Sequence, residues 1–349
     1  MKDYKHIETE KNKILQKNTS DNQQPPPPAA YYRDPQTGLW KASATPTTQS
    51  EHKNPLLQPT VQKKETIASL IAKSAVRLAQ SGIDTPRNDA ELLLAFCLQT
   101  QLTGLYKVWN EPVPEEINQK YEIILEKRTQ RMPVSYITGT VFFYGLEFIV
   151  DHRVLIPRPE TELLVQKVIE YAKSWSSISK NLVFADVGTG SGVIAISSAY
   201  NLNFLKIYAI DISENILDLT RLNAARYNFE SSINFLKGNL LEPLPEPAHL
   251  IVANLPYISN SEFLTLPPEI TQHEPKEAFL AGEDGLWHIR HLLAMAPEYL
   301  LKGGKILLEI GEKQAAAVTS IAKEHFPLSL CETFKDLAGK DRVVVIHTN

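Results

Sequence analysis

The sequence predicts an α/β protein in which a doubly wound, mostly parallel β-sheet follows a small helical domain. Two observations carry this prediction. From Leu155 onward, short apolar runs alternate with stretches of helical length, as in folds built from strand–helix–strand units. Before that point, apolar residues recur at the 3.6-residue spacing of amphipathic helices instead. The change of period marks a boundary between two kinds of structure.

The composition narrows the classes of protein to consider. The formal net charge is −4, whereas proteins that bind nucleic acid are usually basic. The cysteines, Cys97 and Cys331, are too far apart in sequence to suggest a disulfide framework. There is no apolar leader at the N-terminus and no run of about 18 or more apolar residues. We therefore expect a cytoplasmic protein that forms no stable complex with nucleic acid or membranes.

Residues 1–60 differ in composition from the rest of the chain. They are rich in Asn, Gln, Thr, Lys and Pro, and they show little apolar periodicity. Such a segment cannot bury enough apolar surface to offset the entropy lost on ordering it. We interpret it as a disordered extension, and Tyr31, Tyr32 and Trp40 as scattered aromatic residues rather than a docking motif.

Residues 61–139 are predicted to form a small helical domain. One apolar stripe at helical spacing comprises Ile67, Leu70, Ile71, Ala75 and Leu78. The run Asp84-Thr85-Pro86 signals a helix start before an apolar face at 89–98. A further helix is expected over 115–131, because Pro133 ends it.

Residues 140–154 are predicted to form a β-hairpin that links the helical domain to the sheet. The segments 141–144 and 146–150 are aromatic and β-branched, and Gly145 lies between them. Such a composition is typical of two strands joined by a tight turn.

Residues 155–349 are predicted to form the α/β domain. The seven expected strands are 182–187, 206–211, 234–237, 250–254, 305–310, 328–333 and 342–347. The expected helices are 192–200, 213–227 with Ser213 as its cap, 286–300 and 312–325. The last two strands are separated by a short turn, so they should pair antiparallel. A parallel sheet with one antiparallel terminal strand is typical of Rossmann-like class I methyltransferases rather than of dehydrogenases.

A glycine loop follows the first of these strands and opens a helix. It consists of Gly188, Thr189, Gly190, Ser191 and Gly192. Glycines let the backbone turn tightly and let a ligand approach without a Cβ clash. Such a loop can hold a dinucleotide pyrophosphate at the helix N-terminus. However, the spacing is not Gly-x-Gly-x-x-Gly, and the carboxylate of the preceding Asp186 favours an ammonium or sulfonium group over a pyrophosphate.

Asp211 ends the second strand, about 20 residues after the glycine loop, where a carboxylate can accept hydrogen bonds from both ribose hydroxyls of an adenosine. That role suits NAD and S-adenosylmethionine equally. Asp211 can also be an ordinary residue at a helix start.

The fourth strand runs into the tetrapeptide Asn254-Leu255-Pro256-Tyr257. Ligands of open parallel sheets bind beyond the carboxyl ends of the strands, so the tetrapeptide and the glycine loop should share one edge. The Asn254 side-chain oxygen and the Leu255 carbonyl can accept the N–H groups of a planar, amide-like nitrogen. Pro256 stiffens the turn, and Tyr257 offers a flat face for stacking.

The tetrapeptide alone could be a plain turn, because Asn and Pro favour turns. Its place after a strand that ends beside the glycine loop favours methyl transfer by positioning, with neither a strong general base nor a metal. His288 and His291 lie on one predicted helix without a Cys or carboxylate partner, so we interpret them as a solvated helix face and expect no metal site.

The sequence resembles the PrmC/HemK family, which methylates the glutamine of the Gly-Gly-Gln motif in peptide chain release factors. Besides the glycine loop and the tetrapeptide, the segments that carry the resemblance are 131–139, 155–162, Glu274-Pro275, 281–285 and 335–342. The helical domain matches the family in size and place, and the resemblance implies that it recognises the substrate. Residues 1–60 are not explained by the family.

The resemblance also implies roles for individual residues. Residues 188–192 and Asp211 would bind S-adenosylmethionine, and the tetrapeptide would bind the glutamine amide, with Asn254 next to the cofactor. Asn239 and Leu240 stand where relatives contact the adenine, in place of a common Asp and a common aromatic residue. Leu255 replaces a common proline, a change that a backbone carbonyl should tolerate. The expected partner is a release factor, and the protein is expected to be a monomer.

Three alternatives remain at this point. An adenine-N6 methyltransferase of nucleic acid would use the same tetrapeptide, but it needs a surface that extrudes a base, and no basic tract or added domain suggests one. A nicotinamide-dependent oxidoreductase explains the glycine loop but not the tetrapeptide. A catalytically silent binding protein would be expected to lack one of the two motifs.

Overall fold

The computed structural model describes residues 31–33, 40–42, 65–175 and 182–349. The chain divides into two compact units, Met1–Pro59 and Thr60–Asn349. Within the first unit, β1 (Tyr31–Arg33) and β2 (Trp40–Ala42) pair antiparallel. The other residues of the expected extension at 1–60 lie outside the described ranges, so its disorder stays a prediction.

The helical domain consists of α2 (Ile67–Gln80), α3 (Pro86–Cys97), α4 (Leu102–Lys107), α5 (Glu115–Thr129) and α6 (Val134–Thr138). Thr66 caps α2: its hydroxyl accepts from the Ser69 N–H (3.2 Å). The apolar stripe of α2 packs on α3 and α5 around a buried Tyr121. The three longer helices confirm the prediction, whereas α4 and α6 were not predicted because they are too short to show a periodic pattern.

A β-hairpin follows the helical domain, as predicted. Strands β3 (Thr140–Phe143) and β4 (Leu146–Ile149) pair antiparallel. Tyr144 and Gly145 both have positive φ, which is the backbone of the tight turns that suit hairpins. The side chain of Asn223 anchors the hairpin: its amide donates to the carbonyls of both Ile149 and Ser191 (2.9 Å each). The hairpin is thereby tied to the glycine loop.

The α/β domain is built on a seven-stranded sheet with the order β10-β11-β9-β8-β5-β6-β7. Its strands are β5 (Leu182–Val187), β6 (Leu205–Asp211), β7 (Ile233–Lys237), β8 (Ala248–Ala253), β9 (Leu300–Glu309), β10 (Leu330–Lys335) and β11 (Asp341–His347). Strand β11 runs antiparallel to both of its neighbours, and the other pairings are parallel. The predicted fold class is confirmed.

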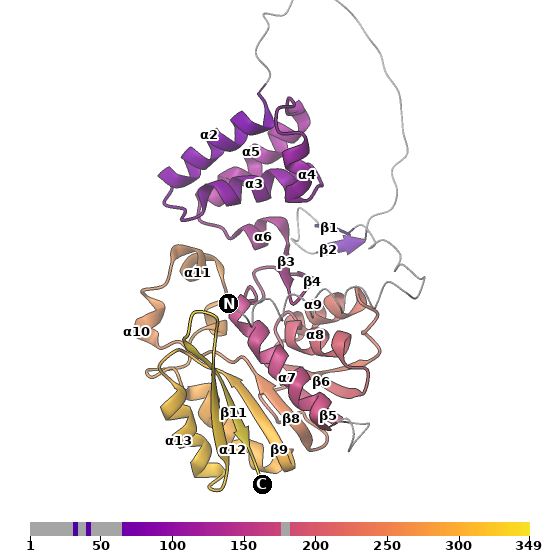
Figure 1. Cartoon of the computed structure of the whole chain (residues 1–349), viewed down its shortest axis with the longest axis vertical. Helices are drawn as coiled ribbons and strands as arrows, with labels where there is room; N and C mark the ends of the chain where they lie inside the picture. The colour runs from indigo at the N-terminus through magenta and orange to yellow at the C-terminus, as the bar shows by residue number, and fades with distance from the viewer. Residues whose placement is uncertain (1–30, 34–39, 43–64, 176–181) are drawn as a thin grey trace, which may run out of the picture. The chain divides into compact units, whose positions relative to one another are not determined.

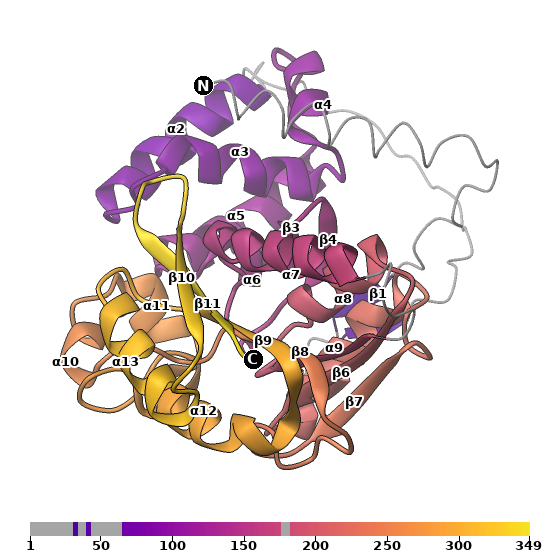
Figure 2. The ribbon, with the colours of Figure 1, turned by 60° about the horizontal axis from the view of Figure 1, so that its bottom comes forward.

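Helices cover both faces of the sheet (Figures 1 and 2). On one face lie α7 (Glu162–Trp175), α8 (Val193–Asn201) and α9 (Glu214–Ala225), and on the other α12 (Trp287–Tyr299) and α13 (Ala315–His325). Residues of β5 alternate between two cores: Phe184 joins the first layer and Ala185 the second. Because β5 is buried on both faces, its sequence is apolar except for Asp186 and does not alternate with polar residues.

The sheet reverses its direction of growth at β5. The chain continues from β5 to β6 and β7 on one side, and then returns to place β8 on the other side of β5. Val187 pairs with Ala253, so the residues that follow these two strands emerge next to each other. Such a switch point is where open α/β sheets bind ligands.

Between β8 and α12, the chain forms short elements that were not predicted: α10 (Asn260–Phe263), α11 (Pro268–His273) and η2 (Lys276–Ala278). Glu269 of α11 joins this insert to the helical domain. Its carboxylate accepts from Arg128 (3.1 Å) and Arg131 (2.6 Å), and Arg128 also pairs with Asp89 (2.7 Å). The insert and the helical domain are therefore held by a partly buried ion-pair network. None of the helices in the described part of the chain has the length and apolar character needed to cross a bilayer.

Candidate active site

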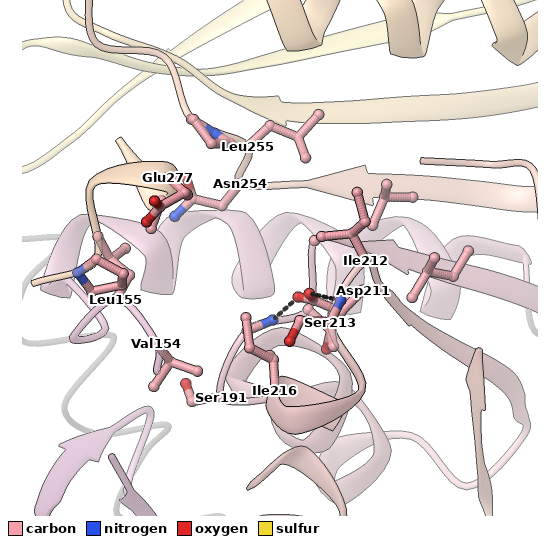
Figure 3. Close-up of a pocket in the computed structure, with 18 of the residues that line it drawn as sticks. Val154, Leu155, Ser191, Asp211, Ile212, Ser213, Ile216, Asn254, Leu255 and Glu277 are labelled. Atoms are coloured by element: carbon pink, nitrogen blue, oxygen red, sulfur yellow. Dashed lines mark hydrogen bonds between the residues drawn. The ribbon is translucent and has the colours of Figure 1, made fainter. Parts of the chain in front are cut away.

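A cavity of about 430 Å³ opens at the carboxyl ends of β5, β6 and β8 (Figure 3). Its volume falls in the range of small-molecule sites, roughly 300–1,000 Å³. The predicted site residues that line it are Gly188, Thr189, Gly190, Ser191, Asp211, Asn239, Leu240, Asn254, Leu255 and Pro256. Gly192 and Tyr257 are not among the lining residues.

The glycine loop is held by its backbone. The N–H groups of Gly188 and Thr189 both donate to the Ile210 carbonyl (2.9 Å each), which joins the loop to β6. Asp186 also holds the loop in place, because its Oδ2 accepts from the Thr189 hydroxyl (2.8 Å) and the Ala195 N–H (3.1 Å). Burial raises the pKa of Asp186 to about 7. Asp186 does not line the cavity, so it supports the loop instead of lying beside a cationic ligand as we expected.

Gly192 shapes the loop although it does not line the cavity. Its φ is +83°, and a Cβ there would lie 2.6 Å from Thr220 Cγ2 and 2.8 Å from Ile196 Cδ1. Thr220 cannot easily move away, because its hydroxyl donates to the Gly190 carbonyl (2.7 Å). Only glycine can adopt this positive φ without strain and also leave room for the side chains of Thr220 and Ile196.

We expect Gly192→Ala to lower the free energy of unfolding by about 3 kcal/mol, because the left-handed backbone costs about 1–2 kcal/mol and the overpacking about 1–3 kcal/mol. Denaturant unfolding measures this change. Gly339→Ala is a matched control, since Gly339 has a φ of +77° but no atom within 4 Å of its added Cβ. Equal losses in the two variants would contradict the packing role of Gly192.

Asp211 lies at the end of β6 with both carboxylate oxygens facing backbone N–H groups. Oδ2 accepts from Gly190 (3.2 Å) and Oδ1 from Ser213 (3.1 Å), as the dashed lines in Figure 3 show. Ser213 is the N-cap residue of α9, but its side chain makes no capping hydrogen bond, so that part of the prediction is wrong. The Asp211 carboxylate satisfies the backbone there instead. Burial raises its pKa.

Apolar side chains that line the cavity include Ile212, Ile216 and Leu240. Leu240 has a φ of +50°, a conformation that costs a non-glycine residue about 1–3 kcal/mol and is concentrated at functional sites. Asn239 also lines the cavity, and its side-chain Nδ2 donates to Glu242 Oε1 (3.0 Å).

The tetrapeptide lies directly against the glycine loop. A Cβ at Gly188 would approach Leu255 Cδ2 to 3.0 Å, so the glycine makes room for this leucine. The Asn254 Nδ2 donates to the Thr161 hydroxyl (3.1 Å). In the part of the chain that the structure describes, no protein donor is bonded to Asn254 Oδ1 or to the Leu255 carbonyl. Two acceptors are thus left available next to the cavity.

Tyr257 is fixed at both its backbone and its side chain. Its hydroxyl donates to Glu309 Oε1 (3.2 Å), and its carbonyl accepts from Gln314 Nε2 (2.9 Å). A Cβ on Gly285 would lie 2.4 Å from the same carbonyl, so residue 285 must be glycine for the chain to pass here. The stacking role expected for the Tyr257 ring stays a prediction.

Sequence reasoning missed part of the lining. The unpredicted residues are Arg153, Val154, Leu155, Pro157, Thr161, Val187, Val193, Ile194, Ile210, Ile212, Ser213, Ile216, Gly238, Pro275, Glu277, Ala278 and His288. Leu155 and Glu277 lie across the cavity from Asp211 (Figure 3). His288 is half-buried and lines the cavity, so its interpretation as part of a solvated helix face is wrong; burial lowers its pKa. No group of three potential metal ligands occurs in the described ranges.

The missed segment 155–161 is held in place by Glu274. Glu274 Oε2 accepts from the Ile156 N–H (3.0 Å), and its other oxygen pairs with Arg158. Glu274 and the segment 155–161 both belong to the parts of the sequence that resemble the PrmC/HemK family. The resemblance could therefore have indicated that this segment lines the cavity.

Comparisons with known proteins identify the family of the chain. Residues 69–139 match the family model for the PrmC N-terminal domain, and residues 161–279 match that for ribosomal protein L11 methyltransferase. The chain is 35% identical over 290 residues to the release factor glutamine methyltransferase of Bacillus subtilis, which covers 82% of this chain and 99% of the relative. The chain belongs to the release factor glutamine methyltransferase family.

The chain is also similar to two further proteins. The enzyme of Thermodesulfovibrio yellowstonii is 37% identical over 260 residues, covering 74% of this chain and 91% of the relative. A crystal structure of the release factor-specific protein-(glutamine-N5) methyltransferase from Alicyclobacillus acidocaldarius is 28% identical, with a TM-score of 0.35, and covers 58% of this chain and 99% of that chain. The match to the PrmC N-terminal domain ends at residue 139, where we predicted the helical domain to end.

Proposed function

We propose that this protein transfers a methyl group from S-adenosylmethionine to the side-chain amide nitrogen, N5, of the glutamine in the Gly-Gly-Gln motif of peptide chain release factors. Membership of the family supports the activity. The observation that carries the proposal is the pair of available acceptors, Asn254 Oδ1 and the Leu255 carbonyl, at the edge of the cavity. A primary amide offers two N–H groups, which match these two acceptors.

The cavity suits S-adenosylmethionine. Asp211, at the end of β6, would accept from the ribose hydroxyls, and the apolar lining that includes Leu240 would contact a flat base. The glycine loop brings backbone within reach of a ligand without side chains in the way. When bound, S-adenosylmethionine supplies a methyl group activated by a sulfonium charge.

The residues of the tetrapeptide then act by orientation. An amide nitrogen is a poor nucleophile because its lone pair is delocalised into the carbonyl. Hydrogen bonds to Asn254 Oδ1 and the Leu255 carbonyl hold the nitrogen in one place and favour the geometry that it takes as the new bond forms. Pro256 restricts the backbone that carries this carbonyl. Holding two reacting groups in line can supply much of a rate enhancement. As the nitrogen–methyl bond forms, the sulfur–methyl bond breaks and S-adenosylhomocysteine is released. The nitrogen becomes more acidic and gives one proton to water, so no strong base is required.

The experiment that tests the proposal uses the full chain and S-adenosylmethionine labelled in its methyl group. We expect label in a purified release factor, and none in a variant in which the glutamine of the Gly-Gly-Gln motif is alanine. Double-stranded DNA and RNA oligonucleotides are offered in parallel. Label in the nucleic acid and not in the release factor would favour an adenine methyltransferase and contradict the proposal.

A further inference from the structure

Behind the tetrapeptide lies a buried polar cluster that the proposed mechanism does not use. It consists of Thr161 in η1 (Pro159–Thr161), Glu309 at the end of β9, and the side chains of Asn254 and Tyr257. Thr161 and Glu309 are each 2% exposed, so water does not compete for their hydrogen bonds. Thr161 accepts from Asn254 Nδ2 (3.1 Å), and Glu309 Oε1 accepts from the Tyr257 hydroxyl (3.2 Å).

Glu309 needs a second donor. Its Oε2 is buried and has no hydrogen-bond partner in the described ranges. An unsatisfied buried oxygen costs about 1–3 kcal/mol, more when it is charged. The Thr161 hydroxyl accepts from Asn254 Nδ2, so its own proton is left to donate, and Thr161 lies close enough to Glu309 to lower the pKa of this carboxyl. We infer that this proton serves Glu309 Oε2. A threonine hydroxyl can donate only one hydrogen bond. Once it donates to one partner, its oxygen can only accept from the others.

We propose that Thr161 and Glu309 are positioning residues that set the orientation of the Asn254 side-chain amide. This inference rests on the proposed function. When Thr161 donates its proton to Glu309, its oxygen can only accept from Asn254, and Asn254 must present Nδ2 to Thr161 and Oδ1 to the substrate. If Thr161 instead donated to Asn254, the amide would turn and present its N–H groups to the N–H groups of the substrate. The Tyr257 hydroxyl on the other oxygen of Glu309 fixes the carboxylate for this task.

The charge state of Glu309 controls this choice. An ionised carboxylate can only accept, so it takes the Thr161 proton, whereas a protonated one can donate to Thr161 and release the constraint. Burial raises the pKa of Glu309 to about 7; Thr161, Arg342 and Tyr257 oppose this rise, and Glu160 adds to it. The amide orientation that suits the substrate is therefore favoured as the pH rises through about 7.

The first test replaces the Thr161 hydroxyl. Thr161→Val keeps the shape of the side chain but removes the hydroxyl that links Asn254 to Glu309, whereas Thr161→Ser keeps the hydroxyl. We expect Thr161→Val to lower kcat for release factor methylation at least about tenfold, with the Kd for S-adenosylmethionine changed less than about twofold, and Thr161→Ser to retain most of the activity. Because Thr161 also lines the cavity, a loss that lies only in cofactor affinity would overturn the proposal.

The second test is the pH profile between about 6 and 9. We expect kcat of the wild type to rise with pH to a plateau above about 7, and kcat of Glu309→Gln to be lower and nearly independent of pH in this range. An unchanged profile in Glu309→Gln would also overturn the proposal. If the wild type does not methylate the release factor at all, the proposed function is wrong. If the wild type and Thr161→Val methylate it equally, the proposed function stands and only the positioning role of Thr161 and Glu309 is wrong.

A measurement without substrate gives an independent readout. The folded pKa of Glu309, about 7, lies above its ordinary value of 4.5. The folded state therefore holds a proton that the unfolded state has lost over this interval, so the contribution of Glu309 to stability falls as pH rises from 4.5 to 7. The free energy of unfolding of the wild type, relative to Glu309→Gln, should decrease over that interval and level off above it. A constant difference would show that Glu309 does not titrate there.

Discussion

Replacing Asn254 with alanine is expected to lower the rate of methyl transfer about 100-fold or more, because the substrate nitrogen loses the acceptor that holds it in line with the methyl group. The affinity for S-adenosylmethionine should change little, since Asp211 and the glycine loop remain. The measurements are kcat with labelled cofactor and a release factor, and the cofactor Kd by calorimetry.

Asn203→Ala is the matched control for this variant. Asn203 is exposed and lies just before β6, at the end of the sheet away from the cavity. The same chemical change there should leave both values as in the wild type. Turnover of Asn254→Ala near that of Asn203→Ala would remove Asn254 from the mechanism.

Replacing Asp211 with alanine is expected to weaken S-adenosylmethionine binding about 100-fold. Two hydrogen bonds from ribose hydroxyls to a carboxylate are lost, and even at the low end of about 1.5 kcal/mol each they amount to about 3 kcal/mol. The Gly190 N–H also loses its partner, so the glycine loop is held less firmly. Calorimetric titration of the protein with the cofactor measures the effect, without any need for a release factor.

Asp218→Ala serves as the control for Asp211→Ala. Asp218 lies on α9, just beyond β6, and its side chain is 59% exposed and paired with Arg221. Its removal changes the net charge by the same amount without touching the cavity. An equal weakening in both variants would mean that overall charge, and not a contact with the ribose, accounts for the result.

The sequence predicted the sheet well for a physical reason. Strands β5, β6 and β8 are buried on both faces, so each appears as a short apolar run between polar turns. The general rule that ligands bind at the carboxyl edge then brought Asp211 and Asn254 together, although they are far apart in the chain. The short helices α4, α10 and α11 carried no periodic signal. Helix α7 does show helical periodicity, in the buried Leu164, Val168 and Ala172, and this helix could have been predicted from that pattern.

The second layer of the site was beyond sequence reasoning. Thr161 and Glu309 lie far apart in the chain and meet through strand order and a buried turn, for which no local pattern exists. The hydrogen bond from the Tyr257 hydroxyl to Glu309 was likewise not suggested by residue type, and the stacking role of the ring stays a prediction. Asp186 was assigned to a ligand for its charge, whereas its geometry makes it a support for the glycine loop.

The place of β11 between β9 and β10 has a consequence for folding. Strand β10 has no other neighbour in the sheet, and Glu309 is paired across the sheet with Val343 of β11. Until β11 enters, the chain presents the open edge of β9, whose apolar residues 306–308 and unpaired N–H and C=O groups favour pairing with another molecule. Slow insertion of β11 would therefore cause aggregation during refolding. Charged or proline substitutions in β11 should lower the yield of refolded protein by more than their effect on the free energy of unfolding accounts for.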